Sequence, residues 1–148
     1  MKLPLIAVFV AAALAAGCSL SMPNPMGTHT PTVSAKLSAS AEVPPNSSAG
    51  SGTLEGRYNT DTQVLRWKVT YTGLSGPVTA AHFHGPAAPG TNTGVVVPFS
   101  GSLGSPIEGE AKLSAIQASD LLAGKWYVNL HTAANPGGEI RGQVTPNN

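Results

Sequence analysis

Short segments of this chain alternate apolar and polar side chains with a period of two residues, which is the pattern of a half-buried β-strand. In one segment, Leu65, Trp67, Val69 and Tyr71 share one face, and Arg, Lys and Thr side chains occupy the other. Further strand patterns occur at 36–43, 51–58, 79–84, 94–99, 107–113, 126–130 and 140–144. Turn-forming residues separate them, drawn from 17 Gly and 13 Pro among others. About eight short strands predict an all-β fold, an antiparallel sandwich or barrel.

One segment has the pattern of a helix instead. Ser114 and Gln117 have the spacing of a capping box, in which each side chain bonds the other's backbone N–H. Apolar residues follow, and Gly124 stands where a helix commonly ends in a left-handed residue. We therefore expect a single short helix near 114–123.

The N-terminus has the pattern of an export signal. Lys2 precedes an apolar stretch, and small residues stand before Cys18, the only Cys of the chain. The sequence Ala-Ala-Gly-Cys resembles a bacterial lipobox, which implies that 1–17 is a lipoprotein signal peptide and that the Cys18 thiol carries the lipid. Ser19 in place of Asp favours the outer membrane on the same resemblance. The alternative is an ordinary signal peptide followed by a Cys that has no such role.

Composition sets the remaining limits on organisation and partners. Segment 18–32 is rich in Pro, Ser and Thr without periodicity, so we expect a flexible, lipid-anchored linker before a folded domain at 33–148. Eight basic residues stand against seven acidic ones. A nucleic-acid partner is therefore not expected, because a nucleic-acid-binding protein needs a basic face. The expected partners are the membrane, through the lipid anchor, and other envelope proteins.

Three of the four His occupy two strand segments. His82 and His84 lie two residues apart, so on a strand they point to one face, while Phe83 between them points to the core. In 126–130 the apolar residues share a face, so Tyr127, Asn129 and His131 project from the other. Two adjacent imidazoles and a third from a neighbouring strand would form a three-nitrogen metal site, which suits copper, with zinc as the alternative. Equally open is that these histidines only support turns through backbone hydrogen bonds.

Two charged residues occupy the last strand segment. Glu139 and Arg141 share its non-core face, and Arg141 could steer an anion toward the histidines. The alternative is a solvated strand charge, or an ion pair with Glu139.

Six segments stand out in order along the chain: 42–45, 73–76, 80–87, 121–124, 127–132 and 135–142. Together they resemble the CHRD domain, named after chordin and common in bacterial secreted proteins and lipoproteins. The resemblance implies an immunoglobulin-like, Greek-key β-sandwich without a firmly assigned activity for the bacterial members.

A fainter resemblance is to Cu/Zn superoxide dismutase, also a Greek-key sandwich. His82-Phe83-His84 is similar to that family's copper-ligating pair, which implies copper-ligand roles for His82, His84 and His131 and an anion-guiding role for Arg141. The segment 85–93 contains no His for a bridging or zinc ligand, and a single Cys allows no internal disulfide. The resemblance therefore extends to a copper-only site at most.

Three functions remain open on these residues. The favoured hypothesis is a lipid-anchored envelope protein that binds a metal ion through the three histidines. The first alternative is a non-catalytic protein-binding or structural module without metal, by analogy with chordin. The second is a copper-only enzyme similar to superoxide dismutase, so catalysis is left open, with a non-enzyme expected.

Overall fold

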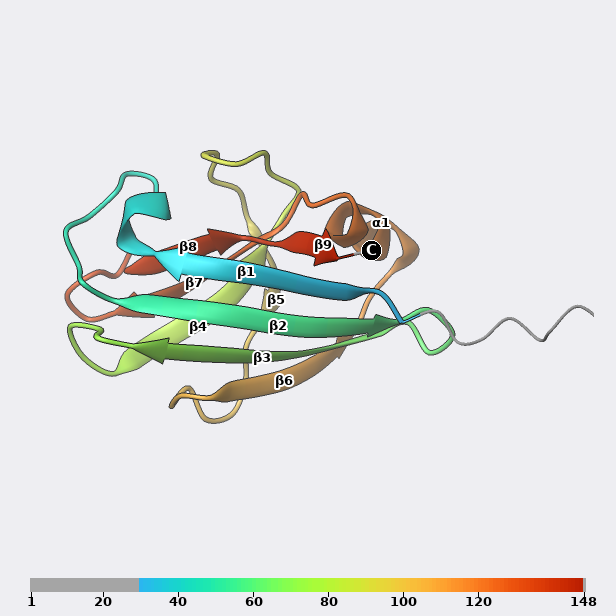
Figure 1. Ribbon diagram of the computed structural model, residues 1–148, viewed down its shortest axis with the longest axis horizontal. Coiled ribbons are helices and arrows are strands. Elements are labelled where there is room, and N and C mark those ends of the chain that lie inside the picture. Colours follow the sequence, from blue (N-terminus) through green and yellow to red (C-terminus); the bar gives the residue numbers. More distant parts are fainter. Residues whose placement is uncertain (1–29, 148) are drawn as a thin grey trace, which may run out of the picture.

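A computed structural model describes residues 30–147 of the chain (Figure 1). The signal peptide, Cys18 and nearly all of the linker predicted from the sequence lie outside these residues. The described part contains nine strands, one α-helix (α1, Ala115–Leu122) and one 3-10 turn (η1, Ala39–Ala41). The strands are β1 (Thr32–Ser38), β2 (Ser51–Asn59), β3 (Val64–Thr72), β4 (Val78–His84), β5 (Val95–Pro98), β6 (Ile107–Lys112), β7 (Tyr127–Thr132), β8 (Ile140–Gln143) and β9 (Thr145–Asn147).

The strands form two layers that join at one edge. One layer has the order β1-β2-β3-β6, with β9 beside β1, and the other has the order β5-β4-β7-β8 (Figure 1). All strand pairs are antiparallel, and the layers meet where Ser38 of β1 lies opposite Arg141 of β8. The fold is thus the antiparallel all-β sandwich, close to a barrel, that the alternation predicts. None of the helices at 30–147 is long and apolar enough to cross a membrane.

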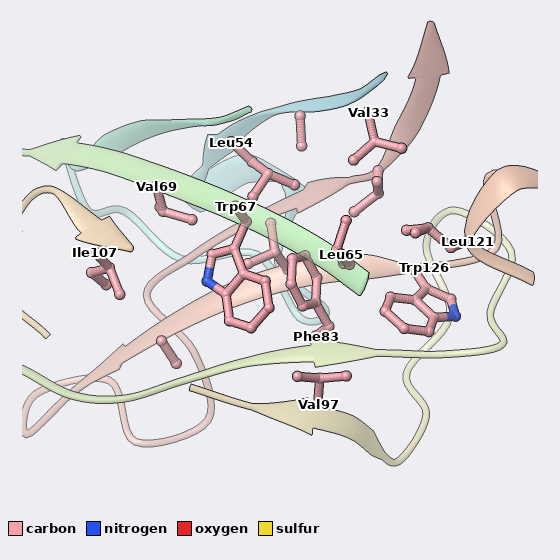
Figure 2. Packing of buried hydrophobic residues seen from close by; sticks show 14 of the residues in the cluster. Val33, Leu54, Leu65, Trp67, Val69, Phe83, Val97, Ile107, Leu121 and Trp126 are labelled. Atoms are coloured by element: carbon pink, nitrogen blue, oxygen red, sulfur yellow. The ribbon is translucent and has the colours of Figure 1, made fainter. Parts of the chain in front are cut away.

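The core lies between the layers and is built from the apolar faces identified in the sequence. Phe83 of β4 meets the Trp67 ring of β3 edge-to-face, with 5.2 Å between centroids (Figure 2). Phe99 stacks on Trp67 at 4.9 Å, and Trp126 lies against the other side of Phe83 at 5.6 Å. Each buried aromatic or large aliphatic side chain stabilises the fold by roughly 1.5–3 kcal/mol. The cluster unites strands of both layers, so the two sheets hold each other in place.

Helix α1 connects β6 to β7 and forms where the capping box predicts it. The Ser114 hydroxyl accepts the N–H of Gln117, and the Gln117 side chain accepts the N–H of Ser114. Gly124 follows with a φ of +70°, a left-handed conformation that favours Gly after a helix. Leu121 is fully buried in the core. The helix is therefore fixed by its caps and by one apolar face.

The prediction of a strand over 36–43 is wrong in its second half. Strand β1 begins earlier, at Thr32, and ends at Ser38, after which the chain turns through η1. The residues that follow include Pro44 and Pro45, which lack N–H donors and cannot continue a sheet ladder. The turn carries Glu42 over the outer side of β7 and β8, where it is buried. Strand β9, which pairs with β1, has no counterpart in the prediction.

The outer face of β4, β7 and β8 is a second buried layer. Tyr127, Asn129 and Arg141 are only 2%, 4% and 2% exposed, although they point away from the apolar core. The loop between β4 and β5 covers them, through contacts described below, and Glu42 closes the other side. The histidines of β4 and β7 lie on the same outer face. We call the side chains of this face the polar layer, and its members are His82, His84, Tyr127, Asn129, His131 and Arg141.

Candidate metal centre

The three histidines predicted to share a site do lie together. His82 and His84 project from the same face of β4, and His131 projects from the neighbouring strand β7. One ring nitrogen of each lies within 4.8 Å of the corresponding nitrogen of the other two. The strand pairing brings this about, because β4 and β7 are adjacent and antiparallel although 49 residues separate His82 from His131.

Backbone carbonyls fix which ring nitrogens are free to bind an ion. The Nδ1 atoms of His84 and His131 each lie 2.9 Å from a carbonyl oxygen, of Thr93 and Pro136 respectively. A carbonyl can only accept, so both Nδ1 atoms carry the proton and both Nε2 atoms keep a lone pair. Nε2 of His84 is buried and has no hydrogen-bond partner. A buried lone pair without a partner is costly in a folded protein, and a metal ion would satisfy it.

The closest pair of histidines already has the spacing of two ligands of one ion. Nδ1 of His82 lies 3.2 Å from Nε2 of His131. Two nitrogens bound at about 2.0–2.1 Å to one ion stand roughly 3 Å apart. The His84 ring is 5.5 Å from the His82 ring between centroids and perpendicular to it. A ring nitrogen of His84 lies within 4.8 Å of those of His82 and His131, so the third donor stands beside the pair.

Burial favours the neutral form of His82 and His131. The pKa of His82 is lowered by burial and by the neighbouring His131 and His84. Burial also lowers the pKa of His131, against the hydrogen bond to Pro136, which raises it. Because only neutral imidazole binds a metal ion, the lowered pKa values keep the lone pairs available at neutral pH.

Most of the described residues carry the sequence signature of one family. The model of the CHRD domain family matches residues 33–144. The chain belongs to the CHRD domain family. No curated protein and no solved structure matches the chain. The likeness to superoxide dismutase therefore rests only on the residues quoted for it above.

Arg141 of this CHRD domain is an internal support. Its guanidinium donates 2.7 Å hydrogen bonds to Asn92 Oδ1 and to the carbonyl of Thr91, and it lies 3.4 Å from the centre of the Tyr127 ring. The alternative of a solvated strand charge is wrong, because the side chain is almost fully buried, and its hydrogen bonds do not involve Glu139. The loop covers the strand here and encloses the cation. The anion-guiding role stays a prediction, and these contacts turn the guanidinium toward the loop.

Glu139 of the CHRD domain anchors three separate segments. It is fully buried, and its carboxylate accepts hydrogen bonds from the hydroxyls of Ser48, Ser75 and Thr132 and from the N–H of Ser75. Burial raises its pKa, but these hydrogen bonds outweigh burial and bring the pKa down to about 2. Glu139 is thus a structural anion that ties the loops before β2 and β4 to β7.

Asn129 of the polar layer and the neighbouring Glu42 border the histidine site, and the sequence analysis gave neither a role there. Asn129 lies directly opposite His82 across the β4–β7 pair, and its Oδ1 atom lies 3.0 Å from Nε2 of His131. Glu42 lies beside Asn129, and burial raises the Glu42 pKa to about 7, against nearby Arg141, which lowers it. The alternation places Asn129 on the same face as His131, and this position could have indicated that Asn129 belongs to the site. Nothing local indicated Glu42, because the turn η1 brings it there.

A groove elsewhere on the domain does not belong to this site. It has a volume of about 1110 Å³, lies mainly over β2, β3 and β6, and has none of the three histidines in its wall. Its charged side chains have both signs, and Arg66 pairs with Glu110 at 2.8 Å. Charges of opposite sign that pair with each other on an open sheet face give the groove no preference for a ligand of either charge. The histidine cluster is therefore the stronger candidate site.

Proposed function

We propose that this CHRD-domain protein binds a metal ion, copper in preference to zinc, through His82, His84 and His131. The observation that carries the proposal is the convergence of one ring nitrogen of each histidine within 4.8 Å of the other two, and Nε2 of His84 is in addition buried without a hydrogen-bond partner. If these histidines only supported turns, one ring nitrogen of each would bond a backbone atom, and the other ring nitrogens would have no reason to converge. Here the Nδ1 atoms of His84 and His131 already bond backbone carbonyls, and the second ring nitrogen of His84 is buried without a partner.

The donor set decides the choice of metal. Neutral imidazoles suit copper and zinc, and the described cluster contains no thiolate or carboxylate. Divalent copper binds nitrogen donors more tightly than zinc does, as the general affinity order of the divalent metals states. Three protein ligands leave a coordination position for solvent or for a further donor.

The chain's own residues preorganise the site before any ion binds. Thr93 and Pro136 orient two rings through their carbonyls, and Tyr127 stacks on the His84 ring with 4.6 Å between centroids. His82 and His131 are half-buried, so an ion can reach them from solvent, while His84 is 9% exposed at the inner side. Such second contacts fix ring orientation and raise metal affinity.

Titration of Cu(II) and Zn(II) into residues 19–148 tests this proposal. The protein should bind one ion, and His82→Ala, His84→Ala and His131→Ala should each weaken binding at least tenfold, because each removes a donor. His29→Ala is the matched control, since His29 belongs to the 18–32 segment expected to be a linker and is not among the three histidines of the proposed site. Equal, weak binding by all of these proteins would exclude the site.

The contacts of Arg141 favour binding over dismutation. A copper-only dismutase needs a cation that attracts superoxide at the open position, and the Arg141 guanidinium is bound to Asn92, Thr91 and Tyr127. The copper-loaded protein should therefore show no dismutase activity above that of free copper. Activity well above that level, lost in Arg141→Met, would restore the enzymatic hypothesis.

We also propose that the protein is held at the bacterial cell envelope, with the outer membrane favoured, by a lipid on Cys18. The support is the apolar N-terminal stretch and the small residues before this Cys. In a bacterial host, the wild-type chain should sediment with membranes and incorporate a labelled fatty acid. Cys18→Ser should do neither, and membrane attachment of that variant would contradict the proposal.

A further inference from the structure

We infer that the side-chain oxygen of Asn129 is a fourth donor of the site, which makes it a three-nitrogen, one-oxygen site selective for divalent copper over Cu(I). The inference rests on the proposed function and specifies its ligand set. It is carried by the position of Asn129, by the two oxygen contacts of His131, and by Glu42 on the far side of the amide.

Asn129 stands at the centre of the polar layer. In the strand register it lies opposite His82 on β4 and opposite Arg141 on β8, two residues before His131 on its own strand. Its side chain is 4% exposed. A buried amide in this place must have partners for its oxygen and its nitrogen.

The amide nitrogen faces Glu42. A Cβ placed on Gly138 would touch Glu42 Oε1 and would lie 2.9 Å from Asn129 Nδ2, so the two atoms border the same point. With Nδ2 on the side of Glu42, the Oδ1 atom lies on the other side of the amide, 3.0 Å from Nε2 of His131.

His131 is consequently placed between oxygen atoms. Its Nδ1 lies 2.9 Å from the Pro136 carbonyl, and its Nε2 lies 3.0 Å from Asn129 Oδ1. Neutral imidazole has a single N–H, and Pro136 takes it. Two lone pairs then face each other between His131 and Asn129 with no proton between them. This contact is unfavourable in the metal-free protein, and a cation bound by both atoms would make it favourable.

The distances agree with shared coordination. Asn129 Oδ1 and His82 Nδ1 lie 3.0 and 3.2 Å from the same Nε2 atom of His131. Ligand atoms of one copper or zinc ion, bound at about 2.0–2.1 Å, stand roughly 3 Å apart. The side-chain carbonyl is a hard donor, and hard donors favour divalent ions, whereas Cu(I) prefers soft sulfur ligands. Asn129 should therefore strengthen Cu(II) binding much more than Cu(I) binding.

Binding of Cu(II) and Cu(I) to residues 19–148, measured separately by competition with chromophoric chelators, tests the inference. Asn129→Ala should bind Cu(II) roughly 10- to 100-fold more weakly and bind Cu(I) as the wild type does. The midpoint potential of the bound copper then rises by about 59 mV for each tenfold loss. The electron paramagnetic resonance spectrum should keep its imidazole couplings and change its g and copper hyperfine values. Asn129→Asp, which retains an oxygen donor, should keep Cu(II) affinity at or above the wild-type value.

Two controls separate the possible outcomes. Asn59→Ala removes a side-chain oxygen that accepts N–H groups in the β2–β3 turn, and it should change nothing in copper binding. If Asn129→Ala binds both copper ions as the wild type does and has its spectrum, while His84→Ala loses binding, the fourth donor is excluded and the three-His site stands. If His84→Ala binds as the wild type does, the proposed function itself fails. Equal losses of Cu(II) and Cu(I) in Asn129→Ala, with Asn129→Asp no better, would show a structural role and overturn the inference.

Discussion

The Tyr127 ring lies parallel to the His84 imidazole, with 2° between the ring planes and 4.6 Å between centroids. The Arg141 guanidinium lies over the Tyr127 ring, 3.4 Å from its centre. The sandwich thus buries a polar stack outside its apolar core, and this stack holds one face of the candidate site. The site and the covering loop depend on each other for that reason.

The stack predicts that Tyr127 affects metal binding without being a ligand. Tyr127→Leu should weaken Cu(II) binding about tenfold, because the His84 ring loses the surface that orients it. Tyr127→Phe keeps the ring and loses only the 3.3 Å hydrogen bonds with Thr93, so its affinity should stay within a few-fold of the wild type. Competition titration measures both, and equal affinities for the Leu and Phe variants would count against the orienting role.

Arg141 should matter for stability more than its single charge suggests. Arg141→Met removes two charge-assisted hydrogen bonds, to Asn92 Oδ1 and to the Thr91 carbonyl, together with the contact over the Tyr127 ring, and we expect a loss of about 1–3 kcal/mol in the free energy of unfolding. Urea denaturation measures it. Arg66→Met, which breaks the exposed pair with Glu110, is the control and should cost less than about 1 kcal/mol. A smaller effect at Arg141 than at Arg66 would contradict the structural role.

The hydrogen bonds of the Glu139 carboxylate predict that the fold loses stability in acid. Its pKa is about 2 in the folded protein, below the ordinary value of 4.5, so the folded state favours the ionised form. The resulting stability, roughly 3 kcal/mol, is present above pH 4.5 and is lost as the pH falls from there toward 2. Glu139→Gln should be markedly less stable than the wild type at pH 7, and the difference should shrink below pH 4. Denaturation at several pH values measures this difference, with the exposed Glu55→Gln as control. A difference in the free energy of unfolding between wild type and Glu139→Gln that does not change with pH would contradict the prediction.

The Trp67 ring leaves no room for a side chain at Gly109. A Cβ on this β6 residue would lie 2.7 Å from Cε2 of Trp67, whose ring packs against Phe83 and Phe99 and has little room to move. Gly109→Ala should therefore lower the free energy of unfolding by about 1–3 kcal/mol. Gly76→Ala, where a Cβ meets nothing within 4 Å, should have little effect. Similar thermal stability of the two variants would refute the packing argument.

The sequence by itself determined the fold class and most of the elements. The two-residue alternation places Trp67, Phe83 and Trp126 in the core, and the capping box at Ser114 with Gly124 bounds the helix. The same alternation placed the three histidines off the apolar face. These predictions depend only on local periodicity and local hydrogen bonds, so the sequence is sufficient for them. The family assignment over residues 33–144 agrees with the resemblance seen in the motifs.

Only the tertiary structure decided what surrounds the histidines. The pairing of β4 with β7 brings His131 to His82, the β4–β5 loop buries Arg141, and the turn after β1 places Glu42 against Asn129. Each of these contacts joins residues far apart in the chain, and none has a periodic signal. Burial of a polar face depends on what covers it, so alternation could assign a side for Arg141 and Asn129 but could not show that this side is closed to solvent.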